Sequence, residues 1–360
     1  MILPYEMRNS YTNILAIILK HIGDVLVTTP VLTALKGAYP DSRISILVNP
    51  GTEEAIAENP VVDEVLVLDR GSGYGVFKKA WHQVQFALKV RRKKFDLVLE
   101  LSAGDRGAIL GLISGARERV GFDPKNRGFW GRRYFFTKLV DKDTGTQHMV
   151  DYNLALVRAL GIEPSDKRLS FCWTKESETR CRRLLLNHGI RFDDPYVVLH
   201  PTSRWMFKTW NASGYAAVCD YIHDQYRIPV VLSCAPNQVE LKFTNRIIRL
   251  ASHKPISLAG QLSIKELGCL VAHASLFVGV DSAPMHIAAA VNTPVIALFG
   301  PSGEHMWGPW GDGHIVIKKD WDCRPCGRDG CGGRKVSRCL EEIEPKEVFE
   351  AIDHQLGSKG

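Results

Sequence analysis

The stretch that decides the fold is Phe277–Ala290, which reads FVGVDSAPMHIAAA. Its first four residues have the composition of a buried strand, and the polar pair Asp281 and Ser282 ends that strand. Pro284 then falls in the first turn of an alanine-rich run, a position where proline favours the start of a helix. A buried strand followed at once by a helix is typical of parallel α/β sheets, which bind ligands beyond the carboxyl ends of their strands.

The same alternation of short apolar runs and helical patterns extends along the whole chain. The predicted strands are 14–19, 44–48, 65–68, 97–101 and 118–121 in the first half, and 196–199, 230–233, 276–280 and 295–299 in the second. A chain of 360 residues exceeds what one core usually organises, and the polar stretch Pro164–Arg168 is the predicted linker. We therefore expect two Rossmann-like domains, 1–168 and 169–342, that face each other across a cleft. The remaining segment, 343–360, is predicted to form a helix that packs back on the first domain.

Composition narrows the class of protein. The chain is 45% hydrophobic and 24% charged, which is ordinary for a globular protein and excludes a disordered or fibrous one. No apolar run approaches the about 20 residues that cross a bilayer. The apolar run near the start has neither a basic leader nor a cleavage site, so it does not resemble a signal peptide. These features predict a cytoplasmic protein.

Positive charge is concentrated in one segment. The formal net charge is +7, but Arg70 to Lys138 alone contains 16 Lys/Arg against 5 Asp/Glu. This segment is either a solvated surface or one that meets an anionic membrane, a phosphorylated substrate or nucleic acid. Nucleic acid is the least favoured partner, because no helix-turn-helix, RNA-binding or zinc-finger pattern accompanies the charge. We expect the run Arg91–Lys94 to share an exposed helix face at the membrane.

A second motif, LKHIGDVL over 19–26, lies between the first strand and the first helix. Gly23 and Asp24 suit a turn and the first turn of a helix, where the dipole favours a carboxylate. The three-glycine pattern of a dinucleotide site is missing. A carboxylate at this turn also suits a general base acting on a hydroxyl, so Asp24 is a candidate catalytic residue.

A third motif, HPTSRWMFKTW over 200–210, follows a predicted buried strand. The hydroxyls of Thr202 and Ser203, the guanidinium of Arg204 and the ammonium of Lys208 suit a diphosphate, which needs donors and positive charge. The alternative is an exposed polar loop. The stretch also holds three aromatic residues, Trp205, Phe207 and Trp210. They favour the diphosphate site, because such side chains normally line or cap a pocket.

The helix that follows Asp281 offers a further anion site. Either Asp281 or Ser282 is expected to cap it, and its first N–H groups attract negative charge. The small Ala283 lets a phosphate come close. His286, one turn in, is either a packed structural histidine or a sugar contact.

Four of the nine cysteines are clustered near the end of the chain. Cys323, Cys326, Cys331 and Cys339 are separated by two, four and seven residues. This spacing is compatible with a zinc or iron–sulfur site. Reduced thiols or a labile disulfide are the other interpretation, and we expect no metal here.

Together, the GD turn, the HPTS…K…W motif and GVDSAPMHIAAA…TPVIALFGPS resemble the ADP-heptose:lipopolysaccharide heptosyltransferases of glycosyltransferase family 9. The resemblance covers nearly the whole chain in the right order. Within the family, the full HPTSRWMFKTW string and the CRPCGRDGCGGRKVSRCL tail look most like the enzymes that add the branching heptose to the inner core. The resemblance implies a GT-B fold with an N-terminal acceptor domain and a C-terminal nucleotide-sugar domain.

The resemblance also implies roles for individual residues. Asp24 would be the base on the acceptor hydroxyl, and Lys208, with Thr202 and Ser203, would hold the ADP diphosphate. Asp281 would contact heptose hydroxyls, and Glu240 matches loosely a carboxylate near the ribose. The residues expected to line the nucleotide pocket are Gly260, Gln261 and Leu262.

The expected activity is inverting transfer of L-glycero-D-manno-heptose from ADP-heptose to the lipopolysaccharide inner core, at the cytoplasmic membrane face and without a cofactor. Three other functions stay open: another heptosyl step of the same pathway, a nucleotide-sugar epimerase of related architecture, and a non-enzymatic nucleotide- or metal-binding protein.

Overall fold

The computed structural model describes residues 10–68, 73, 75–125, 127–141 and 146–357, and these form two compact units. The first unit is Met1–Ser170 and the second is Phe171–Gly360. Arg70, at the edge of the basic segment, and residues 358–360 lie outside the described residues. Each unit is described by itself.

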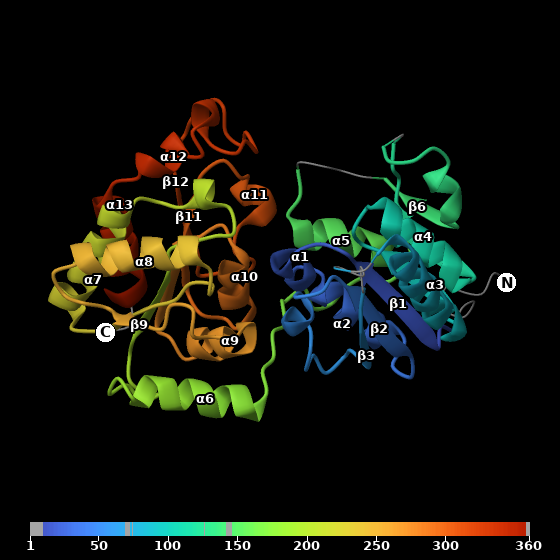
Figure 1. Ribbon diagram of the computed structural model, residues 1–360, viewed down its shortest axis with the longest axis horizontal. Helices are drawn as coiled ribbons and strands as arrows, with labels where there is room; N and C mark the ends of the chain where they lie inside the picture. Colours follow the sequence, from blue (N-terminus) through green and yellow to red (C-terminus); the bar gives the residue numbers. More distant parts are fainter. Residues whose placement is uncertain (1–9, 69–72, 74, 126, 142–145, 358–360) are drawn as a thin grey trace. The chain divides into compact units, whose positions relative to one another are not determined.

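The first unit is a parallel sheet with helices (Figure 1). Its strands are β1 (Asn13–Ile18), β2 (Arg43–Val48), β3 (Glu64–Val67), β4 (Leu97–Glu100), β5 (Glu118–Phe122) and β6 (Lys138–Val140). Its helices are α1 (Ile22–Leu26), α2 (Thr29–Ala38), α3 (Val76–Arg92), α4 (Asp105–Ser114) and α5 (Met149–Arg158), with 3₁₀ turns η2 (Glu53–Ala55) and η3 (Arg132–Phe135).

The second unit repeats this plan. Its strands are β7 (Val197–His200), β8 (Val230–Leu232), β9 (Ile256–Ser257), β10 (Leu276–Val280), β11 (Val295–Phe299) and β12 (Ile315–Lys318). Its helices are α6 (Lys175–Leu186), α7 (Ala212–Tyr226), α8 (Gln238–Leu250), α9 (Ile264–Ala272), α10 (Ala283–Ala290), α11 (Glu304–Trp307), α12 (Arg338–Glu341) and α13 (Pro345–Gly357), with 3₁₀ turns η4 (Met206–Lys208) and η5 (Cys331–Gly333).

Both sheets have the doubly wound strand order. The first runs β3-β2-β1-β4-β5-β6 and the second β12-β11-β10-β7-β8-β9, with every pair parallel. The central strands are buried along their length, as parallel strands covered on both faces must be. In such a sheet the chain reverses its direction of winding beside the first strand, here between β1 and β4 and between β7 and β10. The predicted parallel α/β class is confirmed.

Several predicted boundaries are wrong for local reasons. The helical pattern after the first strand predicts one helix over 24–38, but the structure has two helices, because α2 restarts at Thr29 with Pro30 in its first turn. The predicted strands also omit the edge strands β6, β9 and β12, which are only two to four residues long.

The last helix, α13, was expected to pack on the first domain, and this expectation is wrong. Its apolar residues Val348 and Ile352 are fully buried in the core of the second unit, where α13 packs against α7, β11 and β12. The amphipathic face of α13 therefore completes the second core.

The predicted basic helix face also needs correction. Helix α3 ends at Arg92, and Lys93 turns inward to bind Glu64, with 2.6 Å between the Nζ and carboxylate atoms. Lys94 then takes a left-handed backbone conformation, so the four residues do not share one helix face. Arg91, Arg92 and Lys94 are exposed. Among the described residues, no helix has the length and apolar character to span a bilayer.

Candidate active site

An ion pair at the carboxyl edge of the second sheet joins two loops that are far apart in the sequence. Lys208, in the loop after β7, and Asp281, directly after β10, lie with Nζ and Oδ2 2.5 Å apart. Both side chains are largely buried, so water screens this pair only weakly. The pair sits where winding of the sheet reverses, which is the usual ligand position in such sheets.

A second group of hydrogen bonds fixes the loops after β7 and β8. The Thr202 hydroxyl donates to Glu240 at 2.6 Å, and the Asn237 amide donates to the other carboxylate oxygen at 2.5 Å. The backbone N–H of Ala235 adds a 3.3 Å bond to Glu240. Glu240 is buried, and its carboxylate therefore orients Thr202 at the edge of the sheet.

His200 ends β7 beneath these loops. Its Nδ1 lies 2.9 Å from the Ser233 hydroxyl after β8, and burial lowers the pKa of His200 to about 4, although the charge of Glu240 opposes the shift. The imidazole is thus neutral near pH 7. It is a structural link between two strand ends.

The aromatic residues of the 200–210 motif have different roles from those expected. Trp205 is exposed, and its ring lies 5.4 Å from the Lys208 ammonium. Phe207 and Trp210 do not line a pocket, because both are buried in the interior. The indole of Trp210 donates to the Ile343 carbonyl at 3.0 Å, and the Ser337 hydroxyl donates to the Phe207 carbonyl at 2.6 Å.

Ser203 and Arg204 complete this loop. The Ser203 hydroxyl exchanges hydrogen bonds with the backbone of Trp205, at 3.1 and 3.2 Å, which closes a tight turn. Arg204 is exposed, with its guanidinium 6.0 Å from the Trp205 ring. Two cations, Arg204 and Lys208, therefore lie within 6.0 Å of the exposed indole.

The start of α10 is not capped as predicted. Ser282 is the N-cap residue but makes no capping bond with its side chain, and its hydroxyl donates back to the Val280 carbonyl at 3.2 Å. Asp281 binds Lys208 instead. Ala283 opens the helix, whereas His286 is buried. The side chain of the N-cap residue therefore accepts no hydrogen bond from the start of α10.

Gly279 lets β10 and β7 approach closely at this edge. A Cβ atom at this position would lie 2.9 Å from the carbonyl oxygen of His200. The loop predicted to line the nucleotide pocket follows the edge strand β9, where Gly260 has a positive φ of 70° and donates its N–H to the Cys234 carbonyl at 3.0 Å, after β8.

Asp24 lies in the first unit, after β1. One of its carboxylate oxygens accepts a 3.2 Å bond from the His21 N–H, which orients the side chain at the start of α1. The other oxygen is 3.7 Å from the Lys20 ammonium, and the side chain is 16% exposed. The carboxylate is thus oriented and reachable.

Glu100, at the carboxyl end of β4, was not among the predicted site residues. It accepts a 3.1 Å bond from the Ser102 N–H, and burial raises its pKa to about 7, against the lowering effects of Ser102, Gly104 and Lys20. Helix α4 packs a glycine on it, because a Cβ at Gly107 would lie 2.1 Å from Glu100 Oε1. One feature of the sequence could have indicated Glu100: it is a charged residue at the end of an apolar strand, a position similar to that of Asp281 directly after β10.

The cysteine-rich tail is held in place by one buried arginine. Arg324 donates to the Gly300 carbonyl at 2.6 Å and the Lys319 carbonyl at 3.0 Å, and binds Glu304 at 3.1 Å. Cys323, Cys326, Cys331 and Cys339 are all free thiols, and only Cys339 is buried. Within the described residues, one group of three side chains is close enough to share a metal ion, and it lies elsewhere, at His223, Asp224 and His253.

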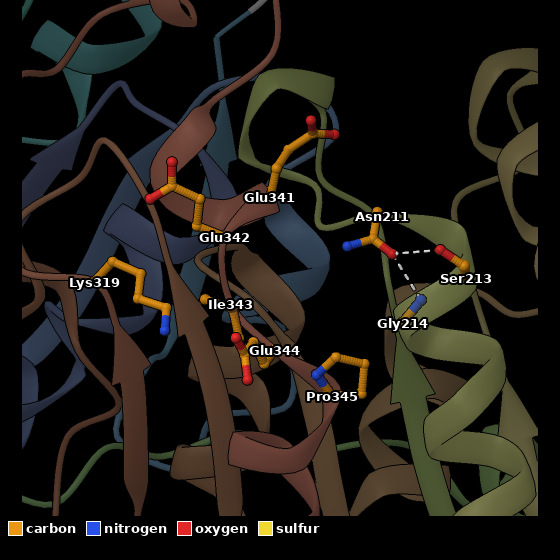
Figure 2. A pocket seen from close by; sticks show the side chains of 9 residues that line it. All are labelled: Asn211, Ser213, Gly214, Lys319, Glu341, Glu342, Ile343, Glu344 and Pro345. Carbon is orange, nitrogen blue, oxygen red and sulfur yellow. Dashed lines mark hydrogen bonds between the residues drawn. The ribbon is translucent and has the colours of Figure 1, made fainter.

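A hollow of about 730 Å³ lies apart from these loops, between the starts of α7 and α13 and the end of β12 (Figure 2). Its charged lining is Glu341, Glu342, Glu344 and Lys319, and Lys319 already binds Glu347 at 2.6 Å. Such a lining repels a diphosphate. The predicted site residues are not part of it.

A family model and a curated relative both match this chain over most of its length, and both are of heptosyltransferases. The model of glycosyltransferase family 9 (heptosyltransferase) matches residues 84–336. Lipopolysaccharide heptosyltransferase 3 of Escherichia coli is 36% identical over 342 residues, which cover 93% of this chain and 97% of the relative.

Solved structures have the same fold over nearly the whole chain. A glycosyltransferase of family 9 from Veillonella parvula matches with a TM-score of 0.87 at 24% identity, covering 98% of this chain and 99% of that one. The E. coli heptosyltransferase WaaC with ADP matches with a TM-score of 0.75 at 18% identity, covering 96% and 100%. The fold is therefore that of the GT-B glycosyltransferases.

The raised pKa of Glu100 predicts a pH dependence of stability. Its folded-state pKa of about 7 lies above the ordinary 4.5, so the folded chain holds a proton in this range that the unfolded chain has lost. The free energy of unfolding should fall as the pH rises from 4.5 to 7 and then level off. Glu100→Gln should remove this slope and stabilise the protein above that range by up to about 3 kcal/mol.

Urea unfolding across this pH range measures the effect. Glu350→Gln on α13, 68% exposed, is the control and should keep the wild-type slope. Equal slopes in wild type and Glu100→Gln would show that Glu100 is ionised when folded.

Proposed function

The chain belongs to glycosyltransferase family 9, the heptosyltransferases, and we propose that it adds the branching third heptose to the lipopolysaccharide inner core. It is a glycosyltransferase of lipopolysaccharide core synthesis, and the choice of the third heptose is supported by its 36% identity to an E. coli heptosyltransferase 3. The donor in this proposal is ADP-heptose. The observation that carries it is the Lys208–Asp281 pair beside the uncapped start of α10.

The second unit binds the donor in this proposal. Lys208 and Arg204 supply positive charge, and the Thr202 and Ser203 hydroxyls and the first N–H groups of α10, from Ser282 and Ala283, supply donors for the diphosphate. Phosphate would compete with Asp281 for the Lys208 ammonium. Asp281 is then released toward the sugar, where its carboxylate accepts bonds from heptose hydroxyls.

Glu240 and His286 have less direct roles. The carboxylate of Glu240 is already bonded to Thr202, Asn237 and Ala235, so we assign it to positioning the Thr202 hydroxyl near the nucleotide. His286 is buried one turn inside α10 and supports the helix start beneath the sugar.

The first unit activates the acceptor. Asp24 takes the proton from the acceptor hydroxyl as its oxygen attacks the anomeric carbon from the face opposite ADP. The new C–O bond forms while the bond to the diphosphate breaks, which inverts the configuration. Lys208 and the start of α10 stabilise the charge that develops on the departing ADP. The proposal includes no metal ion, because these groups supply the positive charge that the leaving group needs.

Location follows from the acceptor. An inner-core glycolipid is embedded in a membrane, so we propose that the enzyme works in the cytoplasm, in peripheral contact with the inner face of the cytoplasmic membrane. The basic segment of the first unit supports this contact, since each Lys or Arg near an anionic surface contributes about 1 kcal/mol.

Product analysis tests the function. The protein is incubated with ADP-heptose and lipopolysaccharides truncated at successive inner-core steps, and the products are weighed. We expect a gain of one heptose only on the acceptor that lacks the branching residue. A gain on a shorter core would indicate one of the earlier heptosyl steps. Conversion of the donor to an epimer that still carries ADP would indicate an epimerase, and ADP release without any acceptor would indicate a hydrolase.

Removing the proposed base should affect turnover and not donor binding. Asp24→Asn keeps the bond from His21 but cannot take a proton, so kcat should fall by about 10²–10⁴-fold. The affinity for ADP should stay unchanged in calorimetry. Asp41→Asn, an exposed carboxylate of the same unit, is the control. Activity within about threefold of wild type in Asp24→Asn would assign the base elsewhere.

Removing the proposed diphosphate-binding cation, Lys208, should affect both ADP binding and turnover. Lys208→Ala should weaken ADP binding by about 10–100-fold, the value of a charge-assisted hydrogen bond, and should also lower kcat. Calorimetry with ADP measures the first effect. Lys319→Ala, in the acidic hollow of Figure 2, should leave ADP affinity unchanged. The opposite pattern, with loss of affinity only in Lys319→Ala, would move the donor site to that hollow.

A further inference from the structure

Helix α3 carries an exposed apolar ridge that the proposed chemistry does not use. The exposed fractions are 92% for Phe77, 63% for Trp81, 51% for Val84 and 41% for Leu88. Spacings of four, three and four residues place all four side chains on one face of the helix. With a rise of 1.5 Å per residue, the ridge is about 16 Å long. A contiguous apolar surface that is exposed to solvent in this way is typical of a site that binds another protein or a membrane.

The opposite face of α3 is the one that holds the helix to the first sheet. Val90 is fully buried in the core of this unit, and Phe86 packs against the same core. Helix α3 is thus apolar on two sides. Helix α4 lies beside it in the fold and exposes Ile109 and Leu112 by 41% and 40%, which adds to the apolar surface (Figure 1).

The charge around the ridge has one sign. Residues 76–94 contain seven Lys/Arg and no Asp/Glu. Arg91 lies over Gly115 at the end of α4, and Lys93 binds Glu64. Among the residues that the structure describes, no acidic side chain pairs with Lys89, Arg92 or Lys94. These three cations therefore have no acidic partner in the part of the chain that the structure describes.

We propose that α3 lies in the plane of an anionic bilayer, with Phe77, Trp81, Val84 and Leu88 between the lipid chains and the basic residues among the headgroups. Amphipathic helices with a Trp- and Phe-containing apolar face and a Lys/Arg-rich border bind membranes in this way. A second copy of the chain fits the ridge less well, because pairing two ridges would bring two positive clusters together. The inference deepens the proposed function, from which it takes only the membrane location of the acceptor.

Vesicle binding by the full chain, without donor or acceptor, tests the proposal. Phe77→Ser/Trp81→Ser should reduce binding to vesicles of phosphatidylglycerol and phosphatidylcholine by roughly tenfold or more. Lys89→Ser/Arg92→Ser should reduce binding to these vesicles but not the weak binding to phosphatidylcholine alone. The matched control is Leu186→Ser/Leu250→Ser, which removes two half-exposed leucines of α6 and α8 and should bind as wild type does.

Quenching by lipids with brominated acyl chains locates the inserted side chain. Trp81→Phe keeps an apolar ridge, so it should bind vesicles as wild type does and yet lose most of the quenching. Trp130→Phe, which changes a 96% exposed tryptophan of the same unit, should keep it. Loss of quenching in Trp130→Phe instead would overturn the assignment to α3.

Two further measurements separate the competing outcomes. Light scattering measures whether the chain is a dimer. If Phe77→Ser/Trp81→Ser converted such a dimer to a monomer and left vesicle binding unaffected, the ridge would be a self-association surface. That result would refute the proposal. Transfer to an acceptor dispersed in detergent should be unchanged in all α3 variants. Vesicle binding without any transfer activity would refute the proposed function and leave this inference intact.

Discussion

Parallel strands that are covered on both faces leave no place for charge along their length, and this constraint organises both units. The strands β1, β10 and β11 are buried nearly throughout, so the polar residues of the chain gather where the strands end. In the second unit, Lys208 and Asp281 meet at such an end, between the two strands where winding reverses. In the first unit, Asp24 follows β1 and Glu100 is the last residue of β4, and these two strands are the equivalent pair.

This constraint also explains how much the sequence could predict. Polar residues directly after an apolar run are visible in the sequence, and most of the candidate site residues were proposed on this basis. The edge strands β9 and β12 were missed because they have only two and four residues, and so short a run is weak evidence for a strand. Glu100 was missed because it belongs to the strand itself, where a charged residue reads as part of the run.

Side-chain direction is what the sequence could not supply. The pattern of α3 contains two apolar faces, one through Phe77 and Trp81 and one through Phe86 and Val90, and periodicity alone does not say which one the sheet covers. The same ambiguity affected Phe207 and Trp210, which were expected at a pocket and are buried in the interior. In both segments, tertiary packing determines which apolar side chains are buried, and the sequence pattern alone does not distinguish them.

The hydrogen bonds of Phe207 and Trp210 link the 200–210 loop to the segment 337–343, near the end of the chain. The Ser337 hydroxyl binds the carbonyl just before Lys208, and the indole just after it binds the Ile343 carbonyl. Lys208 therefore lies between two anchored residues, whose partners Ser337 and Ile343 flank Cys339, the last of the clustered cysteines. A change in the segment 337–343 should therefore also displace 207–210, so the effects of substitutions in these two segments on stability should not be additive.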